Sequence, residues 1–405
     1  MVIFAPLKMG KRMQHFDFKW NIKKSIFLVA FSFLLFSAQA QHEIGDHTSA
    51  LPSDTLHQQN VIANEATAHG DNHDEKFNPG EMIMHHISDA HQIHFVGTLY
   101  MPLPVILWNH GHLDVFMSSA FWDGFDEHGE LKWKSHTTAS GTVYENHHEQ
   151  IVIAGDAHGE HAKPIDLSIT KSVFGMLFII ALMLIIFRNV AARYKAGANK
   201  APTGLQNAIE PFILFVRDEV AIPSIGKKKA GKYLPFLLTV FFFIWLCNML
   251  GLIPFLGGFN ITGTLSITLV LAALVFLITS FSGNAHYWGH IFWPPGIPFG
   301  IKLILVPIEV LSIFIKPAVL MIRLTANITA GHIIILAFVG LVLLFGQNSA
   351  VAGYGVGFGA VLFMIFMFFI ELLVAFLQAY VFTLLAALYF GDATQDHHHH
   401  EEDHH

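Results

Sequence analysis

Long apolar segments dominate the second half of this chain of 405 residues and set the class of fold that it can adopt. Five of them approach or exceed the roughly 20 residues that an α-helix needs to cross the core of a bilayer. They cover residues 173–187 with their flanks, 233–255, 265–281, 301–344 and 356–388. The sequence therefore predicts an all-α polytopic membrane protein with about five transmembrane helices, the last two long and strongly tilted.

The basic residues predict how the chain is oriented. Nine of them lie between the first two spans: Arg188, Arg193, Lys195, Lys200, Arg217, Lys227, Lys228, Lys229 and Lys232. This loop is therefore expected in the cytoplasm, and five spans place the C-terminus there too. Within the loop, residues 205–220 have the pattern of an amphipathic helix lying at the membrane interface, with Glu210, Arg217 and Asp218 on its polar faces.

The N-terminus has the pattern of a secretory signal peptide covering residues 1–40. Lysines precede an apolar core at residues 25–36, and residues 37–40 resemble a small-residue cleavage site. An uncleaved first helix is the alternative, but the apolar core is shorter than a span needs. The stretch before Lys19 is long for such a signal, so Met9 or Met13 is an alternative start of translation.

Residues 41–166 are polar and contain 17 of the 27 histidines, and the signal peptide predicts that they lie outside the cytoplasmic membrane. We expect residues 46–81 to be poorly ordered and residues 93–108 to form short strands. The histidine pairs 85–86, 91 with 94, 110 with 112 and 147–148 leave zinc or copper binding, a solvated surface, pH buffering or a lid open. Residues 392–405 form an acidic, histidine-rich tail that is either native or a purification tag.

Three charged residues follow one another at intervals of seven within the fourth span. A charge at the bilayer centre costs about 2.5–3.5 kcal/mol on insertion scales, so such residues are kept where they face protein or water. Glu309, Lys316 and Arg323 lie on nearly one helix face because seven residues turn the helix by about 700°. Ser312 and Asn327 extend this polar stripe. Pro307 and Pro317 are expected to bend it.

Beyond Arg323 the same face carries Asn327 and then the small residues Ala330 and Gly331, which invite close approach of another helix. His332 lies about 180° away on the same helix. On the last span, Glu371 and Gln378 share a face because they too are seven residues apart.

These residue types predict a proton path with a barrier. His332 and Glu371 can bind and release protons, whereas Arg323 stays charged at any relevant pH. A permanent cation is a poor relay and a good electrostatic barrier. Lys316 either extends its amine towards the membrane surface or pairs with Glu309.

Four segments resemble the family of a subunits of F-type rotary ATP synthases. They are residues 204–210, 246–254, 309–331 and 378–389. Within them the family signature is matched by Lys316-Pro317, Arg323-Leu324, Asn327, Ala330-Gly331 and Tyr389. The resemblance covers residues 168–389, and the combination is highly specific although no single segment is.

The resemblance implies a stator of the Fo sector that faces a rotating ring of c subunits, with b subunits of the peripheral stalk as further partners. It assigns Arg323 as the essential arginine, and Asn327, His332, Glu371 and Gln378 to the proton entry path. It places Glu309 and Ser312 near the cytoplasmic path and matches Tyr389 to the last tyrosine of the family's final helix. It implies a bacterial inner membrane, no ATP chemistry in this chain, no cofactor and no metal.

Two departures from the family pattern stand out. His332 and Glu371 are exchanged relative to many bacterial members, which keeps one imidazole and one carboxylate and favours protons over sodium. The region of residues 41–166 has no counterpart in the family core. A metal transporter and a purely structural scaffold are the competing functions. Arg323 disfavours a neighbouring cation site, and the net charge of −7 argues against nucleic acid as a partner.

Overall fold

The computed structural model describes residues 88–95, 99–109, 111–125, 131–147, 149–154, 163–196, 204–253 and 258–395. The chain divides into two compact units. Among the described residues, the first unit contains 171–331 and 368–395, and the second contains 88–170 and 332–367. The predicted signal peptide, the segment 46–81 and most of the C-terminal tail lie outside the described residues.

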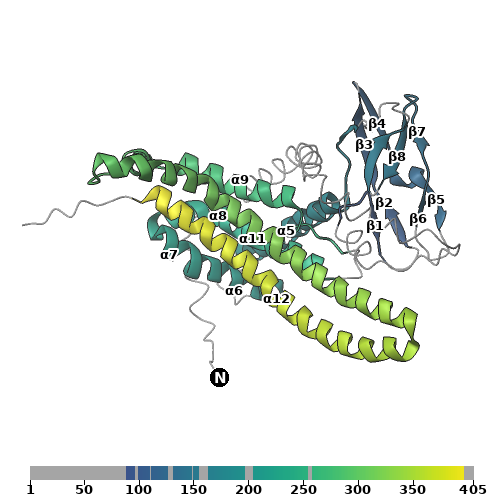
Figure 1. Ribbon diagram of the computed structural model, residues 1–405. Coiled ribbons are helices and arrows are strands. Elements are labelled where there is room, and N and C mark those ends of the chain that lie inside the picture. Colours follow the sequence, from purple (N-terminus) through teal and green to yellow (C-terminus); the bar gives the residue numbers. More distant parts are fainter. Residues whose placement is uncertain are drawn as a thin grey trace, which may run out of the picture. The chain divides into compact units, whose positions relative to one another are not determined.

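The described residues of the second unit form ten short strands in small antiparallel sheets (Figure 1). The strands are β1 (Gln92–His94), β2 (Tyr100–Pro102), β3 (Pro104–Asn109), β4 (His112–Met117), β5 (Trp122–Phe125), β6 (Leu131–Trp133), β7 (His136–Thr137), β8 (Val143–His147), β9 (Gln150–Ile153) and β10 (Ile165–Asp166). They pair as β1–β2, β10–β3–β4, β5–β6 and β7–β8–β9. Strands were expected only at residues 93–108, so the β structure extends further than the sequence pattern indicated.

A small apolar core holds these sheets together. Val105 and Leu107 of β3 and Tyr144 of β8 have no exposed surface, and Phe121 and Ile151 join them. Phe121 lies in the 3₁₀ turn Ser118–Phe121, which connects β4 to β5. Strand β3 buries every second residue in this core because side chains alternate between the two faces of a strand.

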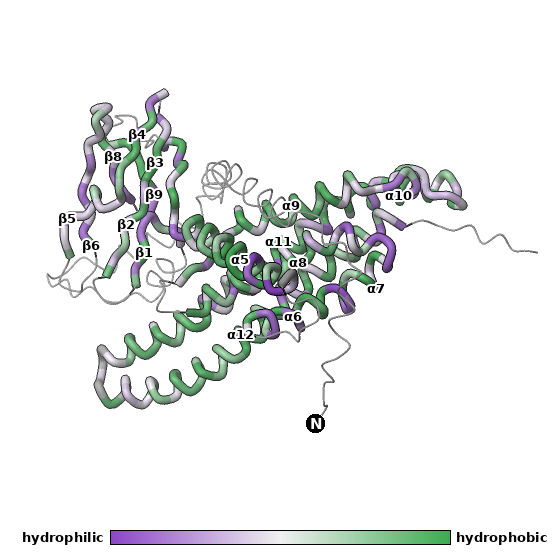
Figure 2. Tube along the Cα trace, turned by 180° about the vertical axis from the view of Figure 1, so that it is seen from behind, coloured by the Kyte–Doolittle hydropathy of each residue, from purple (hydrophilic) through white to green (hydrophobic). Residues whose placement is uncertain are grey.

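The helices begin directly after the strands. They are α5 (Lys171–Ala196), α6 (Leu205–Phe215), α7 (Ile222–Ile225), α8 (Lys227–Gly251), α9 (Leu265–Ser282), α10 (Ala285–Phe292), α11 (Phe299–Asn348) and α12 (Ala350–Thr394). Five of these, α5, α8, α9, α11 and α12, are long and apolar enough to cross a membrane. Figure 2 shows their predominantly apolar character. The five predicted spans are thus present, and the last two are the long ones.

Helix α8 lies at the centre of the first unit. Aromatic side chains fix it against its neighbours: the ring of Trp245 lies 4.6 Å from that of Phe212 in α6, and Phe241 lies 5.8 Å from Phe376 in α12. Nearer the start of α8, the ring of Tyr233 stacks on Phe390 of α12 at 5.0 Å. Helix α12 is therefore held against α8 along much of its C-terminal half.

The loop between the first two spans differs from the prediction. Helix α6 continues through a π-helical segment, Val216–Ala221, into α7. Glu210 and Arg217 are buried rather than on exposed polar faces, and the Arg217 Nε donates to Asp218 at 2.9 Å. The extra residue per turn of a π-helix rotates the helix face, which changes the pattern expected from a regular α-helix.

Both prolines of the fourth span remain inside one continuous helix of 50 residues, α11. The helix α10, between the third and fourth spans, was not predicted. Its eight residues include Gly289 and two histidines, and so short a segment gives little periodic signal.

Candidate functional site

Arg323 lies on the exposed side of α11. Asn327, one turn further on, is exposed as well, whereas Leu320 and Leu324 have only 2% and 1% of their surface exposed. Leu320 and Leu324 therefore anchor the helix to the rest of the unit, while the Arg323 side chain stays exposed. Within this unit the polar stripe that the spacing predicted faces outward at its Arg323 end.

Two hydrogen bonds behind Arg323 fix α11 against α9 and the segment before it. The hydroxyls of Thr325 and Thr268 lie 2.6 Å apart, and the Thr329 hydroxyl donates to the backbone oxygen of Gly263 at 3.5 Å. Short threonine side chains allow two helices to approach closely in an apolar environment. The part of α11 that carries Arg323 is thus held from its rear side.

The carboxylate of Glu371 in α12 lies against Gly331 of α11. A Cβ atom added to Gly331 would overlap the Glu371 Oε1 atom, so this glycine makes room for the carboxylate. The other oxygen, Oε2, is buried and has no hydrogen-bond partner among the described residues. The close approach that the small residues predicted is therefore made by α12, and it brings Glu371 next to the helix of Arg323.

Gln378 is buried in α12, with 5% of its surface exposed, seven residues after Glu371. Between them, the backbone oxygen of Ala375 accepts a hydrogen bond from Asn248 of α8 at 3.2 Å. The Asn248 amide oxygen in turn accepts one from the Thr262 hydroxyl at 2.5 Å. This buried link, which the sequence did not reveal, fixes the stretch of α12 that carries both polar side chains.

His332 lies in α11, immediately after Gly331, and is half-buried. It is the first residue of α11 that belongs to the second unit. Glu309 and Ser312 are half-buried nearer the start of α11. The Ser312 hydroxyl donates to the backbone oxygen of Ile308 at 2.9 Å, a bond within its own helix.

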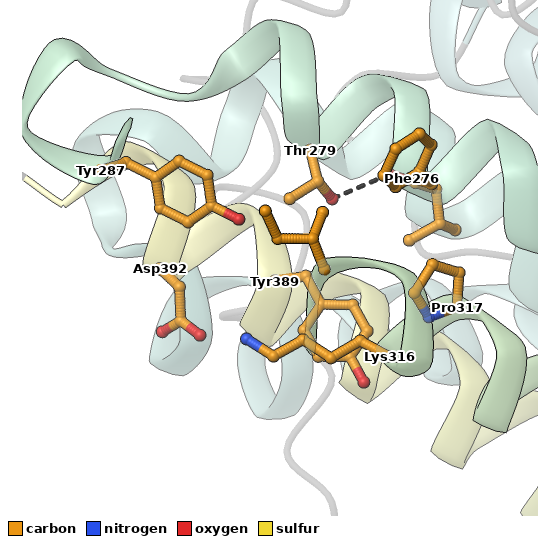
Figure 3. Close-up of a pocket in the computed structure, with 9 residues that line it drawn as sticks. Phe276, Thr279, Tyr287, Lys316, Pro317, Tyr389 and Asp392 are labelled. Atoms are coloured by element: carbon orange, nitrogen blue, oxygen red, sulfur yellow. Dashed lines mark hydrogen bonds between the residues drawn. The ribbon is translucent and has the colours of Figure 1, made fainter. Parts of the chain in front are cut away.

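A small pocket of about 20 Å³, lined by both apolar and polar side chains, lies between α9, α10, α11 and α12 near Tyr389 (Figure 3). Its lining includes Lys316, Tyr287 and Asp392, and the Lys316 Nζ lies 5.4 Å from the centre of the Tyr389 ring. That volume is sufficient for about one water molecule. Lys316 thus contacts an aromatic ring of α12, and no ion pair with Glu309 is found in the part of the chain described.

Glu309 acts on the same pocket from a distance. Burial raises the pKa of Tyr287, and the negative charges of Asp392 and Glu309 raise it further. The charge of Glu309 therefore reaches this pocket. The pocket contacts α11 at Ile313, Lys316 and Pro317, nearer the start of the helix than Gly331, which Glu371 contacts. Sequence reasoning missed Tyr287 and Asp392 because neither lies within the apolar part of a span.

Several described histidines of the second unit contact other protein side chains. His91 is almost fully buried, and its Nε2 lies 2.8 Å from the Asp166 carboxylate. Burial alone lowers the pKa of His91, but the hydrogen bond and charge of Asp166 outweigh it and raise the pKa. His94 stacks on Tyr100 at 4.3 Å. Among the described residues, no group of three His, Cys, Asp or Glu is placed to hold a metal ion.

Comparisons with known proteins cover both parts of the chain. The family model "ATP synthase A chain" matches residues 173–391, and a "domain of unknown function (DUF8433)" matches residues 82–167. ATP synthase subunit a 2 of Chlorobaculum tepidum is 43% identical over 251 residues, which are 59% of this chain and 68% of that protein. Subunit a of an Anaeromyxobacter species is 31% identical over 343 residues, 80% of this chain and 72% of the relative. This chain belongs to the ATP synthase A chain family.

Proposed function

We propose that this subunit a guides protons through two separate half-channels against a ring of c subunits, with Arg323 as the fixed cation between them. As a member of its family, the chain is a proton-translocating stator subunit of the Fo sector and works with other subunits of the ATP synthase. It makes and breaks no covalent bond, and ATP is formed elsewhere in the complex. The single observation that carries the proposal is the outward-facing Arg323 on an apolar helix.

The exposed side of α11 is the proposed contact with the ring. A guanidinium that faces pure lipid pays a large desolvation penalty, so an exposed intramembrane arginine implies a polar or charged partner. A carboxylate on each ring subunit supplies that partner. Arg323 favours the ionised form of the carboxylate that passes it and so promotes proton release. Once protonated, a carboxylate enters lipid at far lower cost because it carries no charge.

The entry path is proposed to run from the outer side along Glu371, His332, Gln378 and Asn327. Two observations on α11 and α12 support this path. The buried Glu371 oxygen without a hydrogen-bond partner among the described residues is a ready acceptor for a proton or a water molecule. Asn327 is exposed on the same side of α11 as Arg323, next to the proposed ring contact.

The exit path is proposed to pass Glu309, Ser312 and Tyr389 towards the cytoplasm. The small pocket whose lining includes Lys316, Tyr389 and Asp392 supports it, because it has room for about one water molecule between α11 and α12. Along α11, Arg323 lies between Gly331, which Glu371 contacts, and Lys316, which lines this pocket. Its positive charge therefore opposes direct proton leakage from one path to the other.

The finer arrangement in the cell is also a proposal. Residues 1–40 are cleaved as a signal peptide, residues 41–166 lie outside a bacterial inner membrane, residues 167–391 form the channel domain, and 392–405 form a cytoplasmic tail. The nine basic residues between the first two spans support this orientation. Helix α6 lies along the cytoplasmic interface, and b subunits of the stalk and lipid complete the surroundings.

The test is Arg323→Ala in membranes that contain the assembled complex. We expect proton-driven ATP synthesis to be lost while the amount of assembled complex stays normal. The matched control is Lys302→Ala, which removes another cation of α11 whose Nζ lies 4.3 Å from the Trp293 ring centre. That variant should keep normal synthesis. Synthesis at the normal rate in Arg323→Ala would contradict the assignment.

A further inference from the structure

The sheet formed by β10, β3 and β4 carries large apolar side chains on both faces. On its inner face Val105 and Leu107 are completely buried in the apolar core of the second unit. On its outer face six large apolar side chains are exposed by 41–62%: Trp108, Leu113, Val115, Met117, Ile165 and Leu167. A sheet with one face in water normally alternates apolar and polar residues, so this second apolar face calls for an occupant.

In strand β4 the acidic residue faces inward and the apolar residues beside it face outward. Asp114 is buried, and its carboxylate accepts hydrogen bonds from Tyr144 at 2.9 Å and from Ser140 at 3.0 Å. Its neighbours Leu113 and Val115 have 54% and 62% of their surface exposed. Burying a carboxylate is costly unless it is hydrogen-bonded, and these two bonds reduce that cost. They stabilise an orientation of the strand in which Leu113 and Val115 face outward.

The exposed side chains form one continuous patch rather than scattered residues. In the strand register Trp108 faces both Leu113 and Ile165, and Ile106 faces Val115. Directly opposed residues lie about 4.5–5.5 Å apart, so their side chains touch across the sheet. Continuous apolar patches of this kind mark contacts with membranes or other proteins.

The chain itself ties the patch to the membrane. The backbone N–H of Leu167 donates to Ile106 at 2.9 Å, and that of Ile169 donates to Pro104 at 3.1 Å. Helix α5 begins at Lys171, only two residues after the last of these bonds, and is one of the candidate membrane spans. Four residues span at most about 14 Å, so Leu167 is held within that distance of the start of α5.

We propose that this outer face of the β10–β3–β4 sheet rests on the lipid of the outer leaflet. The six exposed side chains include no charged residue, which suits acyl chains better than the polar rim of a protein interface. Trp108 is of the residue type that prefers the level of the lipid headgroups. The proposal concerns the outer domain and is independent of the proton path.

The experiment uses spin labels in the assembled complex, reconstituted in vesicles of phosphatidylethanolamine and phosphatidylglycerol. Cys247, the one cysteine of the chain, is replaced by alanine, and a single cysteine is introduced by Val115→Cys. Collisions of the nitroxide with oxygen, which concentrates in lipid, are compared with collisions with a water-soluble nickel chelate. The control is Thr137→Cys, at an exposed position of β7.

We expect the ratio of oxygen to nickel accessibility to be several-fold higher at Val115 than at Thr137. Leu113→Cys, on the same face, should repeat the result and guards against a local disturbance by one label. Equal ratios at Val115 and Thr137 would show a face in water and overturn the proposal. A Val115 label shielded from both reagents would also overturn it, in favour of a protein partner.

Discussion

Helices α8 and α11 are both apolar enough to cross a membrane, but they differ in how much of their apolar surface is buried within the chain. In the most apolar window of each helix, 83% of α8 is buried inside the chain, against 6% of α11 and 17% of α12. Helix α8 is thus largely covered by its own chain, whereas the most apolar stretches of α11 and α12 are mostly left open to other molecules.

This difference in burial supports the proposed position of the ring of c subunits. Lipid satisfies the apolar side chains on the exposed sides of α11 and α12, but it does not satisfy Arg323. A sliding contact also needs a surface that is not locked by interdigitating side chains of the same chain. In the proposed function, the exposed sides of α11 and α12 provide this surface, and the buried helix α8 supports α12.

The largest expected effect on stability comes from replacing a buried phenylalanine of α8 by alanine, and it is compared with the same replacement at an exposed position of α12. Phe241→Ala in α8 removes a fully buried ring and should destabilise the purified chain by about 3–5 kcal/mol. Phe369→Ala in α12, where 64% of the side chain is exposed, should change stability by less than about 0.5 kcal/mol. Unfolding in detergent micelles measures both. Equal losses in the two variants would mean that the burial contrast does not govern stability.

A smaller effect is expected from filling the contact between α12 and its support. A Cβ on Gly391 would overlap the backbone oxygen of Ser224 in α7, whereas one on Gly300 of α11 would meet no atom. Gly391→Ala should therefore cost about 1–3 kcal/mol through overpacking. Gly300→Ala should be neutral or stabilise by up to about 1 kcal/mol through helix propensity. If Gly391→Ala proved as stable as Gly300→Ala, the C-terminal end of α12 would not be tightly packed.

The smallest effect concerns the polar link from α8 to α12. Asn248→Leu removes the bonds to Ala375 and Thr262 and should cost about 1 kcal/mol for each lost bond. The control Thr383→Val loses only a bond to Ala379 within its own helix and should be close to neutral. Thermal unfolding of the two purified variants compares them, and a control that is destabilised more than Asn248→Leu would argue against the link.

Much of the membrane part could be predicted from the sequence, because the length of a continuous apolar segment depends only on neighbouring residues in the chain. The third span was placed at residues 265–281 and is observed as Leu265–Ser282. The prolines of the fourth span did not break it, since Pro307 and Pro317 both lie within α11. The small strands before β10 were largely missed, because strands of two to six residues carry too few alternations to be recognised.

The candidate site was predictable only as far as helical periodicity reaches. Spacing along α11 correctly placed Arg323 and Asn327 on one side, and the small Gly331 indicated a close neighbour. Spacing does not identify that neighbour. The partners of Lys316 and Asn248, Tyr389 and Ala375, lie on α12 far along the chain, and only the folded packing brings them together.

The most direct test of the central claim is disulfide cross-linking between α11 and the ring in native membranes. A cysteine is introduced by Ala326→Cys on the exposed side of α11 or by Leu324→Cys on its buried side, opposite a cysteine placed beside the ring carboxylate. Mild oxidation should join Ala326→Cys to the ring and block rotation-coupled ATP hydrolysis until the disulfide is reduced, while Leu324→Cys stays unlinked. A cross-link from Leu324→Cys with none from Ala326→Cys would contradict a ring contact on the face of Arg323.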